Sequence, residues 1–230
     1  MTTQEFFELL DARIAKYDLL CHPFYKAWAA GKLSHEDLRE YGLEYYAQVA
    51  AFPSYLEEFA ARVPDKRLRQ AVIANRDEEN GADGSRPHAE LWLDFVEGMG
   101  GDRGGEQHPP HAVPEIAELT NWFHSIARDG RTEEALAAFY AYESQVPRVA
   151  AEKGRGLREM YGADEKTCGY FTLHTTADVY HSRVWRLQLA QLVENDCKAA
   201  TRALDAGENA AHALWNALDG IEAQRLARAA

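Results

Sequence analysis

The sequence is poor in three features that would each define a class of protein: cysteine, clustered positive charge and long apolar runs. Its 230 residues include three cysteines, Cys21, Cys168 and Cys197, which lie far apart and do not predict a disulfide framework. No segment approaches the ~20 consecutive apolar residues of a membrane-spanning helix. The first residues also lack the basic and then apolar order of a signal peptide. We therefore expect a cytoplasmic protein without a membrane partner.

Positive charge is in deficit as well. The chain has 25 Lys and Arg residues against 37 Asp and Glu residues, a formal net charge of −12, and its basic residues are scattered among acidic ones. Nucleic acids and anionic membranes require clustered basic residues, so neither is an expected partner. The acidic excess has two explanations. It belongs to solvated helix faces, or part of it is turned inward to meet a cation.

What the sequence does contain is a helical pattern through nearly its whole length. Apolar residues recur at helical spacing, and glycine, proline and capping residues separate the segments. Residues 100–112, rich in Gly, Pro and His, indicate the one clear loop. We predict an all-α protein of about seven to nine helices, a single domain over residues 1–230. One predicted helix begins near Thr132 and is bent by Pro147. A segment with Tyr170 leads into the stretch from His174 and on through Trp185.

The stretch from His174 to His181 carries the clearest chemistry. In a helix of about 100° per residue, His174, Asp178 and His181 fall within an arc of about 60°. Two imidazoles and a carboxylate suit iron or manganese better than a structural zinc, which usually recruits cysteine. The alternative is a polar helix face whose side chains hydrogen-bond one another.

Further side chains could complete such a site. Glu143 lies in an apolar and aromatic segment, where an unpaired charge is costly. Glu78 ends one predicted helix, and His88 begins the next. Three carboxylates and three imidazoles are the ligands of carboxylate-bridged di-iron sites in helical bundles, which leave positions open for dioxygen. The predicted metal ligands are Glu78, His88, Glu143, His174, Asp178 and His181.

Several motifs make the chain similar to a known family. They are His22-Pro-Phe-Tyr25, Asp77-Glu-Glu-Asn-Gly81, Tyr142-Glu-Ser-Gln-Val-Pro-Arg148, Glu152-Lys153 and the segment Tyr170–His181. Over about residues 5–195 the sequence resembles the chlamydial protein associating with death domains and its bacterial relatives. The resemblance implies the haem-oxygenase-like helical fold and a di-metal oxidase or oxygenase, with the six ligands named above.

The resemblance also implies an unusual activity, the synthesis of p-aminobenzoate (4-aminobenzoate) for folate from part of the protein itself. Tyr25 matches the tyrosine that supplies the aromatic ring, and Lys153 matches the lysine that donates the amino nitrogen. Tyr41, Tyr142 and Tyr170 match nearby tyrosines that relay electrons or hold the geometry. The implied cofactors are two transition-metal ions, either two irons or iron with manganese. Dioxygen and an external reductant are the implied partners, and a homodimer is compatible with the family.

The chain departs from the family pattern in an insertion at residues 81–87. The insertion leaves open whether Glu78 or Glu79 is the metal ligand, and it affects the placement of His88. Each aromatic or basic residue also has a simpler interpretation. A tyrosine can pack in the core with its hydroxyl hydrogen-bonded, and Lys153 can be a solvated surface lysine.

Three other functions are consistent with parts of the sequence. A di-metal oxygenase acting on an external amino acid or fatty acid would use the same ligands, and fold alone does not separate the two. A thiamine-salvage or quinone-cofactor enzyme of this fold would need no metal, and six ligand-type residues argue against it. A non-catalytic interaction protein is the fourth function. The presence of both Tyr25 and Lys153 favours the self-sacrificing enzyme.

Overall fold

The computed structural model describes residues 1–82, 84–103 and 113–228, and every regular element within them is helical. The elements in chain order are α1 (Thr3–Ala15), the 3-10 helix η1 (Leu19–Cys21), α2 (Pro23–Ala29), α3 (His35–Arg62), α4 (Lys66–Glu79), α5 (His88–Gly98), α6 (Pro114–Asp129), α7 (Thr132–Glu143), α8 (Val146–Met160), α9 (Gly169–His174), α10 (Ala177–Val193) and α11 (Cys197–Arg228). The all-α prediction is confirmed. Of the predicted loop at residues 100–112, residues 104–112 lie outside the described residues.

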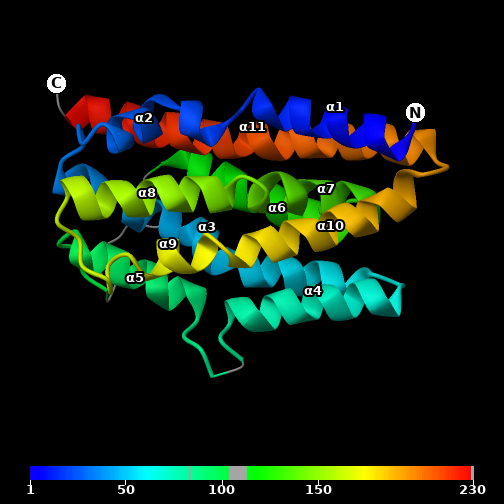
Figure 1. Ribbon diagram of the computed structural model, residues 1–230, viewed down its shortest axis with the longest axis horizontal. Helices are drawn as coiled ribbons and strands as arrows, with labels where there is room; N and C mark the ends of the chain where they lie inside the picture. Colours follow the sequence, from blue (N-terminus) through cyan, green and yellow to red (C-terminus); the bar gives the residue numbers. More distant parts are fainter. Residues whose placement is uncertain (83, 104–112, 229–230) are drawn as a thin grey trace.

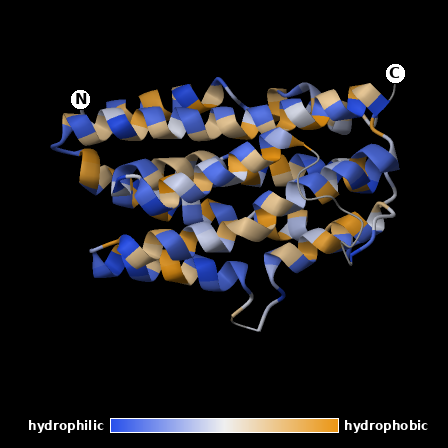
Figure 2. Cartoon of the chain, turned by 180° about the vertical axis from the view of Figure 1, so that it is seen from behind, coloured by the Kyte–Doolittle hydropathy of each residue, from blue (hydrophilic) through white to orange (hydrophobic). Residues whose placement is uncertain are grey.

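The helices form a layered bundle (Figure 1). α1 and α2 lie along α11 on one side, and α4 and α5 lie on the other. Polar and apolar residues alternate around most helices (Figure 2), as expected for amphipathic helices that pack around a common core. Among the described residues, no helix has both the length and the apolar character needed to cross a membrane.

Helix α7 is the centre of the bundle. It packs between α11 and α10, and ten of its 12 residues are buried. A helix that is apolar on all sides belongs in a core, and the alanines of α7 allow its neighbours to approach closely. Glycine does the same on α11, where a Cβ added at Gly207 would lie 2.5 Å from Leu10 Cδ1 of α1. Glu143, the last residue of α7, therefore lies in the interior of the bundle.

Two helix breaks differ from the predictions, and with them the described residues form more helices than the expected seven to nine. α7 ends at Glu143 and α8 begins at Val146, so Pro147 lies in the first turn of a new helix and does not bend a continuous one. A proline is well tolerated in a first turn because its missing N–H would have no intrahelical partner there.

The second break divides the stretch that carries the predicted ligands. α9 ends at His174 and α10 begins at Ala177, so the common helical stripe expected for His174, Asp178 and His181 does not form. The hydroxyls of Thr175 and Thr176 donate to the carbonyls of Thr172 and Leu173, a local alternative to continued helical bonding. His174 therefore lies on a different helix from Asp178 and His181.

Candidate metal centre

Six ligand-type side chains gather in the interior as two groups of three. Glu79 of α4, His88 of α5 and His174 of α9 form the first group, and Glu143 of α7 with Asp178 and His181 of α10 form the second. Each residue of a group offers one ligand atom within 4.8 Å of the others, and all six side chains are at most 6% exposed. Charged residues are rarely buried so completely unless they are paired or bind a metal.

Both groups face the same small cavity. Glu79 and His174 of the first group line it together with Glu143 and Asp178 of the second. A cavity shared by three carboxylates and an imidazole from four helices is the arrangement of a dinuclear site in a helical bundle. The break between α9 and α10 contributes to it, because His174 and Asp178 approach the cavity from two helices.

Glu143 is held at the cavity by two donors. Asn75 Nδ2 donates to its Oε1 at 2.9 Å, and Trp185 Nε1 donates to its Oε2. Burial raises the pKa of Glu143. Burial alone would lower the pKa of His181, but its hydrogen bond to Asp178 and the charges of Glu143 and of other nearby carboxylates raise that pKa to about 10. Both pKa values are raised because buried negative charge is stabilised by a bound proton or by another cation.

The first group contains a buried nitrogen without a hydrogen bond. His88 Nδ1 lies 2.8 Å from Glu79 Oε2, but the angles of a hydrogen bond are not met and the atom has no hydrogen-bond partner. His174 Nδ1 donates to the Tyr170 carbonyl at 2.8 Å, which leaves the other ring nitrogen as a lone-pair donor. The unsatisfied nitrogen of His88 and the lone pair of His174, both beside the buried carboxylate of Glu79, fit a bound metal ion. The oxygen and nitrogen donors suit iron or manganese.

Glu78, the other candidate at this position, lies outside both groups. Its side chain is 42% exposed, and its Oε2 lies 3.1 Å from His181 Nε2. Adjacent residues of a helix point about 100° apart, so Glu79 faces the interior while Glu78 faces its edge. The geometry thus favours Glu79 at the position that the insertion left open. The other five predicted ligands lie within the two groups.

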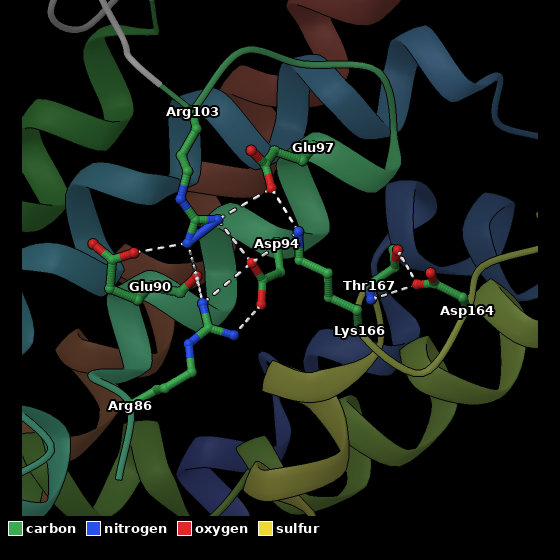
Figure 3. A network of polar contacts seen from close by, with 8 residues as sticks. All are labelled: Arg86, Glu90, Asp94, Glu97, Arg103, Asp164, Lys166 and Thr167. Atoms are coloured by element: carbon green, nitrogen blue, oxygen red, sulfur yellow. Dashed lines mark hydrogen bonds and ion pairs between the residues drawn. The ribbon is translucent and has the colours of Figure 1, made fainter. Parts of the chain in front are cut away.

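The described residues of the insertion, 81–82 and 84–87, begin with a turn and lead up to His88. Gly81 has a φ of 68°, a conformation that glycine adopts without steric cost. Beyond it, Arg86 donates to Asp94 of α5 at 2.5 Å, and Arg103 donates to the same carboxylate at 2.7 Å. Figure 3 shows these cations around Asp94, with Lys166 approaching from the segment before α9. The network ties the turn, α5 and the α9 segment together around the helix that begins with His88.

A second cluster contains the predicted catalytic lysine. Lys153 of α8 is 5% exposed, so the interpretation as a solvated lysine does not hold. Its Nζ lies 2.6 Å from Tyr25 Oη and 2.5 Å from Tyr41 Oη, and the two hydroxyls are 3.0 Å apart. The same amine is 4.0 Å from the centre of the Tyr25 ring. Burial lowers the pKa of Lys153 well below its usual value.

The two clusters adjoin each other through Tyr142 and Tyr170. These two tyrosines line the cavity between the ligand groups and also the pocket that contains Tyr25, Tyr41 and Lys153. Burial raises the pKa of each of the four tyrosines well above 10, so all four are neutral phenols. The structure thus brings the five predicted catalytic residues together beside the ligand groups.

Sequence reasoning missed several residues of the site. Trp185 and Asn75 hold Glu143, and Tyr45 lines the lysine pocket with its ring stacked on Tyr41 at 5.5 Å. Helical spacing contained a signal for two of them. Trp185 follows His181 by four residues and Asn75 precedes Glu79 by four, so each shares a helix face with a ligand.

An all-helical bundle with two adjoining carboxylate–imidazole groups has the architecture of a di-metal protein. Residues 39–215 match the family of iron-containing redox enzymes, and the chain belongs to this family. It is similar to a 4-aminobenzoate synthase of Nitrosomonas europaea, with 36% identity over 96% of this chain and 92% of the relative. A 4-aminobenzoate synthase of Chlamydia trachomatis is 35% identical over 94% of this chain and 91% of the relative.

Solved structures support the fold. A domain of unknown function with a haem-oxygenase-like fold from Shewanella denitrificans superimposes with a TM-score of 0.77, at 16% identity, over 97% of this chain and 91% of that one. At this identity the likeness concerns the fold alone. The predicted haem-oxygenase-like fold and the resemblance to the chlamydial family are both confirmed.

Proposed function

We propose that the protein synthesises 4-aminobenzoate from its own Tyr25, with Lys153 as the amino donor, at a pair of transition-metal ions. The observation that carries the proposal is the contact between the two residues. The Lys153 amine lies 2.6 Å from the Tyr25 hydroxyl in a buried pocket. That pocket adjoins the ligand cavity through two shared tyrosines. The relatives named 4-aminobenzoate synthase support the same product.

The six buried side chains would hold the metal ions. Glu79, His88 and His174 would bind one ion, and Glu143, Asp178 and His181 would bind the other. Either two irons or iron with manganese suits these donors. When bound, the ions supply the activation of dioxygen, with electrons from an external reductant, that oxidation of a tyrosine side chain demands.

The geometry matches the substitution pattern of the product. In 4-aminobenzoate the amino nitrogen is para to the carboxyl carbon, and in tyrosine the hydroxyl oxygen is para to Cβ. The Lys153 amine lies beside the hydroxyl of Tyr25, at the ring carbon where a C–N bond must replace the C–O bond. The Nζ–Cε bond of Lys153 must also break, so that the nitrogen leaves with the ring. The Cα–Cβ bond of Tyr25 must break to release the product, and Cβ becomes the carboxyl carbon.

The pocket prepares the lysine for this role. An amine donates its nitrogen only when it is unprotonated, and burial lowers the pKa of Lys153. The Tyr41 hydroxyl contacts both the amine and the Tyr25 hydroxyl and so fixes their relative position. Because the substrate is part of the chain, no diffusive binding step is required. Tyr142 and Tyr170, between the two cavities, relay electrons or hold the geometry.

Isotope labelling tests the origin of the product. Protein made with ring-¹³C tyrosine and ε-¹⁵N lysine, then given ferrous iron, reductant and dioxygen, should release 4-aminobenzoate that carries both labels. Excess unlabelled tyrosine and lysine in the reaction should not dilute them. Product without the ring label would show that the aromatic ring comes from an external substrate, as in a conventional di-metal oxygenase.

A further inference from the structure

Glu78 contacts a proposed metal ligand from the side opposite to the ligand cavity. Its Oε2 lies 3.1 Å from His181 Nε2. The other ring nitrogen, Nδ1, lies 3.4 Å from Asp178 Oδ1 and 3.6 Å from Glu143 Oε1. The imidazole of His181 therefore stands between a carboxylate at the edge of the bundle and two carboxylates in its interior.

This placement determines which nitrogen of His181 is available. An ionised carboxylate only accepts hydrogen bonds, so the nitrogen that contacts Glu78 must carry its hydrogen. Asp178 and Glu143 make the same demand on Nδ1 while no cation lies between them. A metal ion bound among these interior carboxylates would take the Nδ1 lone pair and leave the hydrogen on Nε2, facing Glu78. Metal-binding histidines usually donate their second N–H to a carboxylate, carbonyl or water, which fixes both the tautomer and the ring orientation.

We propose that Glu78 is a positioning residue that holds His181 ready to bind the second metal ion through Nδ1, and that Glu78 is not itself a ligand. The inference rests on the proposed metal centre. The two nitrogens of an imidazole lie on opposite edges of the ring, so a carboxylate bound to Nε2 is directed away from an ion bound to Nδ1. The 42% exposure of Glu78 agrees with a place outside the buried ligand groups.

The surroundings of Glu78 suit a direct test. It lines a surface cleft with Asp77, His88 and Leu91, among others, so a shorter side chain there leaves no buried cavity. Its neighbour Asp77 is exposed to a similar degree and pairs with Arg76, and it lies outside both ligand groups. Asp77→Ala is therefore a matched control for Glu78→Ala, because it removes a carboxylate from the same helix end.

The experiment is an anaerobic titration of metal-free protein with ferrous iron against a competing chelator. Wild type and Asp77→Ala should each bind two ions. Glu78→Ala should weaken one of them by about 10- to 100-fold, the usual effect of removing such a partner, and leave the other unchanged. Glu78→Gln should keep most of the affinity, because its amide oxygen still accepts the hydrogen bond from Nε2.

The outcomes separate the alternatives. Wild-type affinity in Glu78→Ala would overturn the proposal. Glu78→Gln losing an ion as completely as Glu78→Ala would also overturn it, because an amide replaces a hydrogen-bond acceptor but poorly replaces a carboxylate ligand. If Glu78→Ala loses its helical circular dichroism, the iron affinities of Glu78→Gln and wild type still test the proposal, because Glu78→Gln should bind both ions. Failure of the wild type to bind two ions would instead contradict the proposed metal centre.

Discussion

Lys153 is the residue whose chemistry depends most on its surroundings. Its amine is buried against two phenols, and burial lowers its pKa. The unfolded chain, with a lysine pKa of about 10.4, therefore binds a proton at neutral pH that the folded state disfavours. The amine costs the fold stability at every pH below the unfolded value, and the cost decreases as pH rises toward it. A residue that lowers stability in this way is a candidate for function.

Replacing Lys153 should separate function from stability. Lys153→Met should release no 4-aminobenzoate, and its free energy of unfolding at pH 7 should equal or exceed that of wild type, because the desolvation cost is removed. Lys153→Arg should also release no product, since guanidinium stays protonated. Urea unfolding and product analysis measure both effects. A loss of more than about 2 kcal/mol in Lys153→Met would indicate a structural role for the amine instead.

Tyr25 should be required through its phenol. Tyr25→Phe keeps the ring in place but removes the oxygen at which oxidation begins, so no product should form while two metal ions still bind. Tyr140→Phe is the control. It removes a hydroxyl that bonds to Asp11 at 2.7 Å, at a tyrosine that lines neither cavity of the site, and it should keep full product yield. Product release by Tyr25→Phe would exclude Tyr25 as the source of the ring.

At the scale of the elements, helix starts and ends place the reactive groups. Tyr25 lies in α2, a helix of seven residues whose N-cap is His22. The buried His22 accepts a hydrogen bond from the Phe24 N–H through Nδ1 at 3.1 Å, and its Nε2 lies 3.0 Å from Asp219 of α11. One side chain thus caps the helix that carries Tyr25 and links it to α11.

The cap makes stability depend on pH in a defined direction. Burial, the largest effect, lowers the pKa of His22 despite the opposing hydrogen bond to Asp219. The unfolded chain, with a histidine pKa of about 6.5, takes up a proton first, so this part of the stability is lost as pH falls below about 6.5. His22→Asn keeps a capping oxygen without this titration. Between pH 7 and pH 5 the free energy of unfolding should fall less in His22→Asn than in wild type. An equal fall in both proteins would contradict the role of His22 in this pH dependence.

The elements also show what helical spacing could and could not predict. Periodicity identified the residue types of the site, because His174, Asp178, His181 and Glu143 are polar residues in helical or apolar segments. It did not predict the break after His174, which depends on the hydroxyls of Thr175 and Thr176. The choice of Glu79 over Glu78 also depends on how α4 is rotated against its neighbours, which a single sequence with an insertion does not define.

At the scale of the whole molecule, the bundle contains a large core of buried aromatic and aliphatic side chains. Aromatic rings pack through it, and the fully buried side chains include Trp28, Trp92 and Trp185. The all-α class follows from helical periodicity and the haem-oxygenase-like fold from resemblance, so both could be predicted. The relation between the two cavities could not, because it arises from the packing of helices that are distant in sequence.

Removal of metal should therefore leave the fold intact. After chelation, far-UV circular dichroism should remain helical, because the core is large enough to fold alone. Binding of two ions to the folded state alone should raise the melting temperature. An ion at 100 times its dissociation constant adds about 2.7 kcal/mol per site. Wholesale loss of helix on chelation would show that metal binding and folding are one process.

The central claim is that the enzyme consumes itself, and counting product per chain tests it most directly. Protein loaded with ferrous iron, given reductant and dioxygen but no aromatic substrate, should release no more than a single molecule of 4-aminobenzoate per chain. Peptide mapping of the same sample should find residue 25 without its ring and residue 153 altered, with the other tyrosines intact. Repeated turnover on a small external substrate with Tyr25 unmodified throughout would contradict the account.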